Sequence, residues 1–200
     1  MLDKYEYWDN IAEQVSSDCK VIKDNWHKRR ILLHNLLYYD IEKCDILELG
    51  CGAGTTAYFL SGMYGLRVNY TGVDISKKFI KIANALGLNA LHTKEADSLP
   101  FNDNSFDVLF VFDVLEHIPI EDRQKTYKEL YRVLKNKAIV FMNNPLSKSN
   151  HNPDFDFGFD DMAIAEMAKA LDMRIYEVKT YEGKGSYFYQ FVVLRREEKC

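Results

Sequence analysis

Three glycines alternate with other residues directly after a short apolar stretch, Asp45–Leu49. Residues 50 to 54 read Gly-Cys-Gly-Ala-Gly, and glycine allows both a sharp turn and the close approach of a ligand to the backbone. We therefore expect a strand over Asp45–Leu49, a tight turn, and a helix over Thr55–Leu60. The turn would lie at the carboxyl edge of a sheet, where ligands bind in open α/β folds. A tight turn that binds nothing is the alternative.

The spacing of these glycines and an acidic residue beyond them indicate the class of ligand. Dinucleotide-binding turns prefer Gly-x-Gly-x-x-Gly, in which the extra residue makes room for a pyrophosphate, so the spacing here favours a ligand without pyrophosphate. Asp74 stands 20 residues after Gly54 and follows a predicted strand over Arg67–Val73. A carboxylate at that point can accept hydrogen bonds from both hydroxyls of a ribose. Taken alone, Asp74 fits a solvated or helix-capping residue equally well.

Strand and helix patterns alternate from about residue 45 onward, which is typical of an α/β fold. The run FDVLFVF at residues 106–112 is almost wholly apolar, as expected of a strand buried on both faces of a parallel sheet. Only residues 182–186 separate the last two predicted strands, so these must be antiparallel. We expect further strands over 67–73, 89–94, 138–142, 174–181 and 187–195, and helices over 4–16, 24–38, 120–134 and 160–171, with one more capped by Ser76.

Together these elements predict a doubly wound, mostly parallel, seven-stranded sheet with an antiparallel C-terminal hairpin. We expect a single domain over residues 1–200, in which residues 1–40 form an N-terminal helical cap on an α/β core of residues 41–200. Residues 143–159 mix Asn, Pro, Asp and Phe and are predicted to form a long loop. Loops of that length in compact domains are often functional.

Four ordered motifs give the chain a specific resemblance. They are ILELGCGAG at residues 46–54, YTGVDIS at 70–76, EADSLPFNDNSFDVLF at 95–110 and FDVLEHI at 112–118. With these motifs the chain resembles the class I S-adenosylmethionine-dependent methyltransferases, in particular those that act on small molecules. The resemblance implies a Rossmann-like fold and S-adenosylmethionine as the cofactor. Methyltransferases of nucleobase amines carry a Pro-Pro-aromatic sequence where this chain has FDVLEH, so that acceptor class loses weight.

The resemblance also assigns residues to parts of the cofactor. Asp74 would bind the ribose. Glu95 would accept a hydrogen bond from the adenine amino group, with Asp97 as the competing assignment. The resemblance places Glu48, Gly50, Cys51, Gly52 and Gly54 around the methionine portion, Ile75 and the Ala96 backbone on the adenine, and Phe112 near the methionine amino group or the adenosine face.

Methyl transfer is a displacement at a carbon that the sulfonium already activates, so the protein mainly orients the reactants in a dry pocket. His117, five residues beyond Phe112, is the candidate base for a hydroxyl acceptor, because its intrinsic pKa suits proton transfer near neutral pH. Asp113 is the candidate substrate anchor. The alternatives carry about equal weight: a helix-end role for His117 and a turn role for Asp113.

A small-molecule acceptor is expected to enter between the N-terminal segment and residues 143–159. In the first segment, Tyr5, Tyr7 and Trp8 either form an aromatic lid or simply dock the N-terminal helix. In the second segment, the phenylalanines either form an apolar wall or pin a surface loop. The residues concerned are Phe155, Phe157 and Phe159 for the wall and Asn143, Asn144 and His151 for polar contacts.

Composition bounds the function further. The 200 residues are 47% hydrophobic and carry a net charge of −4, which argues against broad electrostatic binding to nucleic acid. The four cysteines form no Cys-x-x-Cys pair or Cys/His cluster, so no metal site is expected. No apolar run approaches the roughly 20 residues that cross a bilayer, and the N-terminus is not signal-like. We expect a cytoplasmic monomer or homodimer without membrane contact.

Two other classes of function stay open. A nicotinamide-dependent oxidoreductase is disfavoured by the glycine spacing and the terminal hairpin. The main alternative to a small-molecule enzyme that methylates an O or N atom is a methyltransferase fold that acts on RNA or protein, or that serves as a non-catalytic cofactor-binding scaffold.

Overall fold

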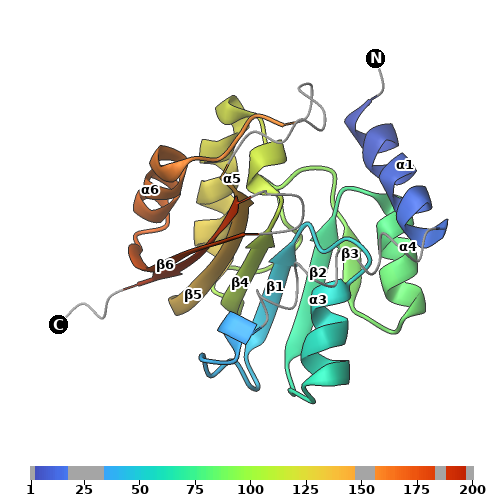
Figure 1. Cartoon of the computed structure of the whole chain (residues 1–200), viewed down its shortest axis with the longest axis horizontal. Helices are drawn as coiled ribbons and strands as arrows, with labels where there is room; N and C mark the ends of the chain where they lie inside the picture. The colour runs from blue at the N-terminus through green and yellow to red at the C-terminus, as the bar shows by residue number, and fades with distance from the viewer. Residues whose placement is uncertain (1–2, 18–33, 147–155, 183–187, 197–200) are drawn as a thin grey trace. The chain divides into compact units, whose positions relative to one another are not determined.

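A computed structural model of the chain describes residues 3–17, 34–146, 156–182 and 188–196 (Figure 1). The chain divides into two compact units, residues 1–94 and 95–200. Among the described residues, the first unit contains three strands and the second contains four. Strands and helices alternate along both units, so the predicted α/β class with seven strands is confirmed.

The first unit is built on three parallel strands in the order β3-β2-β1. They are β1 (Asp45–Leu49), β2 (Asn69–Asp74) and β3 (Ala90–His92). β1 has the predicted bounds, and its apolar side chains are buried. Leu49 pairs with Val73, so the turn that follows β1 lies beside the end of β2.

Helices flank these strands in the first unit. α4 (Lys77–Ala85) begins after the predicted N-cap Ser76, whose hydroxyl accepts a hydrogen bond from the Phe79 amide at 3.2 Å. The helix after β1 differs from the prediction, because α3 (Thr55–Ala57) continues as a π-helix, η1 (Tyr58–Met63). Apolar spacing predicts a helix at this point, but it does not distinguish i→i+4 from i→i+5 hydrogen bonds.

The N-terminal segment forms α1 (Lys4–Ser17), as predicted to within one residue. Figure 1 shows α1 alongside α4, and hydrogen bonds from Ser76 and Lys78 to Asp9 join the two helices. Most of the second predicted helix, residues 24–38, falls outside the described residues.

The second unit contains four strands in the order β4-β5-β7-β6. β4 (Phe106–Phe112) is buried as predicted and pairs parallel with β5 (Leu134–Pro145). β6 (Arg174–Glu182) and β7 (Phe188–Arg195) form the predicted antiparallel hairpin, and β7 also pairs antiparallel with β5. β5 is longer than the predicted strand 138–142, because its pairing with β7 continues to its last residue.

The described part of the second unit also contains three helical segments: η2 (Leu115–His117), α5 (Ile120–Val133) and α6 (Asp161–Ala170). The side chain of Asp160 caps α6 by accepting a hydrogen bond from the Ala163 amide at 2.9 Å. Both longer helices agree with the prediction to within one residue at each end.

The predicted loop of residues 143–159 needs correction, because residues 143–145 belong to β5. Residues 147–155, which include the predicted acceptor contacts Phe155 and His151, lie outside the described residues. Within the described ranges, no helix is long and apolar enough to cross a membrane.

Candidate functional site

The turn after β1 has a backbone conformation that glycine adopts readily and other residues rarely do. Gly50, Gly52 and Gly54 have φ angles of 69°, 53° and 78°, all in the left-handed region. A Cβ atom at Gly54 would lie 2.1 Å from Cδ1 of Leu88, so packing also opposes a larger residue there. A Cβ atom at Gly52 would meet no atom within 4 Å. Open space therefore lies beside Gly52, where a ligand can approach the backbone.

The carboxylate of Asp74 fixes this turn to the end of β2. Its Oδ2 accepts a hydrogen bond from the Gly52 amide at 2.8 Å, and its Oδ1 accepts one from the Ser76 amide at 2.8 Å. Burial raises the pKa of Asp74, and these hydrogen bonds only partly offset that effect. Because each carboxylate oxygen can accept more than one hydrogen bond, the side chain keeps acceptor capacity for the hydroxyls of a ligand.

Glu48 supports the same turn from inside the fold. Its side chain is completely buried. Oε1 accepts a hydrogen bond from the Thr56 hydroxyl at 2.7 Å, and Oε2 accepts one from the Tyr70 hydroxyl at 2.5 Å. These bonds join the end of β1 to α3 and β2, and they involve two residues that sequence reasoning misses. The predicted contact of Glu48 with the methionine portion stays a prediction.

Cys51 packs inside the first unit. Burial, together with the nearby carboxylates of Glu48 and Asp74, raises the pKa of its thiol, so the thiol is uncharged near neutral pH. A Cβ atom at Gly72 would lie 2.7 Å from both Cβ and Sγ of Cys51. Cys51 therefore shapes the turn through its packing, and the Thr-Gly-Val-Asp sequence of β2 provides the space it needs.

The other residues predicted around the cofactor differ in exposure. Ile75 is half-buried, so part of its apolar surface is accessible. In the second unit, Glu95 is exposed and Ala96 is half-buried. Phe112 is only 2% exposed, and its ring stacks on that of Phe110 with the centroids 5.1 Å apart. The contacts of these residues with the cofactor stay predictions.

Asp113, directly after β4, has a φ angle of 57°, which is unusual for a residue other than glycine. Its amide donates to the Asn143 carbonyl at 2.8 Å, and its Oδ1 accepts a hydrogen bond from Nδ2 of Asn143 at 2.8 Å. Oδ1 of Asn143 in turn accepts a hydrogen bond from the Tyr181 hydroxyl at 2.5 Å. This network fixes the left-handed turn at Asp113, and Tyr181 is a member of it that sequence reasoning misses.

Asn144, the next residue of β5, differs from Asn143, whose side chain is hydrogen-bonded. It is 1% exposed, and within the part of the chain that the structure describes neither its Oδ1 nor its Nδ2 has a hydrogen-bond partner. Asn144 pairs with Gln190 of β7, so the two side chains lie on the same face of the sheet, and Gln190 donates to Asp161 of α6 at 3.0 Å. Nearly all buried polar groups in folded proteins are bonded, so this carboxamide is a candidate contact for a ligand or an ordered water.

His117 ends the short helix η2. Its Nε2 atom lies 3.9 Å from Oε1 of Glu116, which is buried, whereas the His117 side chain is 23% exposed. Part of the imidazole is therefore accessible. Glu116 is a further residue that sequence reasoning misses.

The described end of the predicted acceptor segment is held against η2 and α5. The Phe157 amide donates to the Glu116 carbonyl at 2.7 Å. Arg123 donates through Nη2 to the Gly158 carbonyl at 2.5 Å, and its guanidinium lies 5.2 Å from the centroid of the Phe159 ring. Phe159 is buried, which favours a pinning role over an open apolar wall for this ring.

The aromatic residues of α1 lie close together. The rings of Tyr7 and Trp8 meet edge to face with their centroids 5.0 Å apart, and both side chains are half-buried. Tyr5 is half-buried as well. This packing agrees with docking of the helix, and a lid role stays a prediction. In the part of the chain that the structure describes, no group of three or more His, Cys, Asp or Glu side chains could hold a metal ion.

Known proteins share these features over much of the chain. A family model described as a methyltransferase domain matches residues 47–142. An uncharacterized protein of Haemophilus influenzae is 29% identical over 150 residues, which are 71% of this chain and 55% of that protein. The phosphoethanolamine N-methyltransferase of Plasmodium falciparum is 25% identical over 120 residues, which are 58% of this chain and 44% of that protein. The chain thus spans about half the length of these curated relatives.

A solved structure shows the same fold over almost the whole chain. It comes from the complex between the Haloferax volcanii Trm112 methyltransferase activator and a methyltransferase, with a TM-score of 0.77 at 16% identity. The similarity covers 99% of this chain and 98% of that chain. The matched domain includes both the glycine turn after β1 and Asp74 at the end of β2. Residues 47–142 thus match a methyltransferase domain, on the Rossmann-like α/β fold of the class I S-adenosylmethionine-dependent methyltransferases.

Proposed function

We propose that this chain transfers the methyl group of S-adenosylmethionine to an O or N atom of a small-molecule acceptor. The observation that carries the proposal is the open space at Gly52 beside a carboxylate, Asp74, that keeps acceptor capacity. The hydrogen bond between the Gly52 amide and Asp74 orders both groups before a ligand arrives. Such preorganisation reduces the conformational entropy that is lost on binding.

In the first unit, we assign Asp74 to the ribose hydroxyls and Ile75 to a face of the adenine. The turn of residues 50–54 takes the methionine portion, because the backbone at Gly52 has open space beside it through which a ligand can approach. Glu48 acts mainly through this turn, since both of its oxygens are bonded to other side chains of the unit.

In the second unit, we assign Glu95 to the adenine amino group, the Ala96 amide to a ring nitrogen and Phe112 to the adenosine face. Glu95 and Asp97 are both exposed and form a matched pair for testing the register. Glu95→Gln is expected to weaken S-adenosylhomocysteine binding more than Asp97→Asn does, because only the former removes the charged acceptor. The reverse order in a calorimetric titration would move the assignment by two residues.

In the proposed reaction, a lone pair of the acceptor atom forms a bond to the methyl carbon while the carbon–sulfur bond breaks. The electron pair of that bond stays on sulfur, which leaves S-adenosylhomocysteine. A hydroxyl acceptor loses its proton, and we assign His117 to accept it, with Oε1 of Glu116 3.9 Å from its Nε2 atom. We assign Asp113 to orienting the acceptor, since Asn143 holds both its backbone amide and its carboxylate in place.

A small acceptor is supported by charge and by one buried side chain. The net charge of −4 disfavours a polyanionic acceptor. Asn144 offers a donor and an acceptor that have no partner among the described residues, as small-ligand sites often do with a few convergent polar groups. One relative is named for a small amine, phosphoethanolamine.

The test is incubation of the purified protein with methyl-labelled S-adenosylmethionine and a fractionated cell extract. Label in a small-molecule fraction, lost in an Asp74→Ala variant, is the expected result. Label that enters only RNA or protein would overturn the acceptor class. Tight binding of S-adenosylhomocysteine without transfer to any fraction would instead indicate a cofactor-binding scaffold.

A further inference from the structure

Asp9 of α1 contacts the turn that follows β2. Its Oδ1 accepts a hydrogen bond from the Ser76 hydroxyl at 2.5 Å and another from the Lys78 amide at 3.2 Å. Ser76 is completely buried. An N-terminal helix therefore inserts a carboxylate at the start of α4, next to the residue proposed to bind the ribose.

The Ser76 hydroxyl takes part in two hydrogen bonds, as the donor in one and as the acceptor in the other. It has a single hydrogen to donate, and this hydrogen goes to Asp9. Its oxygen accepts from the Phe79 amide at 3.2 Å, which is the N-cap bond of α4. Asp9 thus fixes the rotation of the hydroxyl in the orientation that capping needs.

The backbone amide of Ser76 connects this arrangement to the carboxylate of Asp74. Its amide donates to Oδ1 of Asp74 at 2.8 Å, while Oδ2 of Asp74 holds the Gly52 amide. Asp9, Ser76 and Asp74 are therefore joined in series, with the glycine turn at the far end. Without Asp9, the Ser76 hydroxyl would have to rotate or remain unbonded at a fully buried position.

The electrostatics at the start of α4 favour an ionised Asp9. Burial works to raise the pKa of Asp9, but the hydrogen bonds from Ser76 and Lys78 outweigh it and lower the pKa. A carboxylate at a helix N-terminus also interacts favourably with the helix dipole.

We propose that Asp9 is a positioning residue for the cofactor: through Ser76 it holds the Asp74 turn in the shape that binds the ribose. This inference rests on the proposed binding of S-adenosylmethionine. It couples the docking of α1 to cofactor affinity, and by linkage the cofactor stabilises the docked helix by the same free energy.

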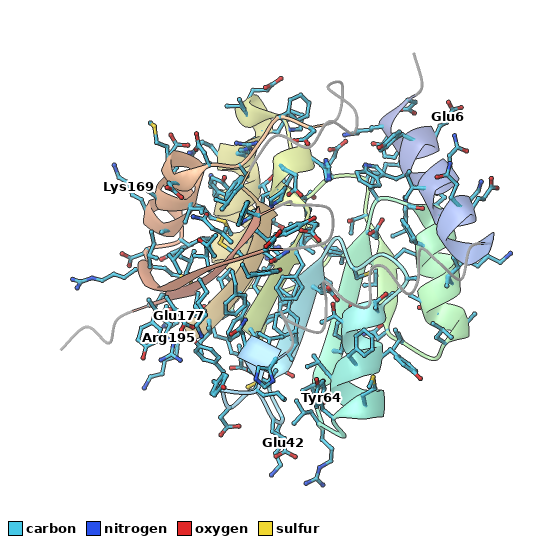
Figure 2. The ribbon with its side chains drawn as sticks, in the orientation of Figure 1. Glu6, Glu42, Tyr64, Lys169, Glu177 and Arg195 are labelled. Carbon is cyan, nitrogen blue, oxygen red and sulfur yellow. The ribbon has the colours of Figure 1, made fainter. Side chains whose placement is uncertain are left out.

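The same helix supplies matched controls. Glu13 lies four residues after Asp9 and pairs with the side chain of Lys78, so it also contributes to docking of α1 on α4 without touching Ser76 in the structure. Glu6 is exposed on the same helix (Figure 2) and serves as a control for net charge. A role in docking alone predicts similar effects for Asp9 and Glu13.

The experiment measures the affinity for S-adenosylhomocysteine by calorimetry in the full chain. Asp9→Ala is expected to weaken binding about 5- to 20-fold, in the range for one hydrogen bond to a charged group that acts indirectly. Asp9→Asn, which keeps an acceptor for Ser76, should recover most of this loss. Glu13→Gln and Glu6→Gln should stay within about 2-fold of the unmodified chain.

Two further measurements distinguish positioning of Asp74 through Ser76 from a general weakening of the docking of α1. In a Ser76→Ala background, Asp9→Ala should cause no additional loss, because the series is already broken. For a cofactor analogue that lacks the ribose 3′-hydroxyl, the loss caused by Asp9→Ala should be smaller than for S-adenosylhomocysteine. Equal losses for Asp9→Ala and Glu13→Gln, additive losses with Ser76→Ala, or the same loss with both ligands would each overturn the proposal.

A cofactor-free measurement distinguishes failure of this inference from failure of the proposed function. Hydrogen exchange at the Phe79 amide should accelerate in Asp9→Ala and stay slow in Glu13→Gln, since Asp9 orients the hydroxyl that this amide bonds. If the unmodified chain does not bind S-adenosylhomocysteine, the proposed function fails regardless of this result. If the chain binds it but the Phe79 exchange is unchanged in Asp9→Ala, the positioning role fails.

Discussion

Asp74 at the end of β2 and Asn144 near the end of β5 are both at least nine-tenths buried, yet the protein treats them in opposite ways. Both oxygens of Asp74 are bonded by backbone amides of its own unit. Neither polar atom of the Asn144 side chain has a hydrogen-bond partner in the described ranges. One polar group is organised before any ligand arrives, and the other is not.

This difference indicates which of the two buried residues lowers the stability of the fold. A buried polar group without a partner costs about 1–3 kcal/mol, so an apolar residue at position 144 would stabilise the fold. Asp74 differs, because two backbone amides bond its oxygens, although burial still raises its pKa. We infer that the cofactor region is rigid in the free protein and that Asn144 is completed by a ligand or an ordered water.

The largest expected effect separates packing from binding within the glycine turn. Gly54→Ala should lower the free energy of unfolding by about 2–4 kcal/mol, because it combines a left-handed backbone with a collision against Leu88. Gly52→Ala should lower it by only about 1 kcal/mol, since the new methyl group meets no atom. Chemical denaturation measures both values.

The two glycine variants should reverse their order in a titration with S-adenosylhomocysteine. Gly52→Ala places its methyl group in the open space where we assign the ligand, so it should lose more affinity than Gly54→Ala measured under folded conditions. A Gly52→Ala protein that binds normally would break the comparison, because the open space would then not be the binding site.

Local features made the cofactor region predictable from the sequence. The bounds of β1 and β4 and the N-cap Ser76 follow from apolar runs, glycines and capping preferences within a few residues. The terminal hairpin follows from a short connection, which leaves the chain no other way to reverse. Asp74 was identifiable because its position relative to the glycines is fixed along the sequence.

The remaining contacts depend on pairings that the sequence does not reveal. Asn143 bonds Asp113, 30 residues away, and Tyr181, 38 residues away. Ser76 bonds Asp9 across 67 residues. Such contacts require the register of β5 against its neighbours and the docking angle of α1, neither of which leaves a periodic signal. The π-helix after α3 is missed for the different reason that its apolar spacing matches that of an α-helix.

The adjacent asparagines of β5 provide the next test. Asn143→Leu should lower the free energy of unfolding by about 2–3 kcal/mol, because it leaves Asp113 and Tyr181 without their shared partner. Asn144→Leu should leave it unchanged or raise it by about 1 kcal/mol, because no hydrogen bond within the protein is lost. Denaturant titrations of the two variants give the comparison directly.

The Asn144→Leu variant should lose activity although it does not lose stability. If this side chain contacts the acceptor, the variant keeps normal cofactor affinity and loses methyl transfer. A destabilised Asn144→Leu protein would instead indicate an ordered water that links the carboxamide to the fold. In that case the contrast between Asp74 and Asn144 would be one of bonding through water rather than of function.

Removing the carboxylate of Asp74 tests the role of the residue that is compared with Asn144. Asp74→Ala should weaken S-adenosylhomocysteine binding by about 1.5–3 kcal/mol, the range for hydrogen bonds to a charged group. The fold should persist, as judged by its circular dichroism spectrum. Unchanged affinity would remove the ribose assignment and with it the distinction between an organised and an incomplete site.

The last comparison concerns the charge of Asp74, which should make both stability and cofactor binding depend on pH. Burial raises the pKa of Asp74 in the folded chain, so the folded state holds the proton more tightly than the unfolded state. Protonated Asp74 therefore contributes most to stability below its pKa in the unfolded state. This contribution is lost as the pH rises through its raised pKa in the folded state. Affinity for the cofactor should move the other way, because only the ionised carboxylate accepts hydrogen bonds from both ribose hydroxyls.

Calorimetric titrations between about pH 7 and pH 4.5 should therefore show weaker S-adenosylhomocysteine binding at the acidic end, by at most about tenfold per pH unit for one proton. Asp9 stays ionised over this interval, because its pKa is lowered and not raised, so the positioning of Ser76 persists while Asp74 titrates. An Asp74→Asn variant controls for groups on the ligand and elsewhere in the chain, and its affinity should not follow the same curve. If the variant and the unmodified chain show the same dependence, the titrating group lies elsewhere and Asp74 is ionised throughout.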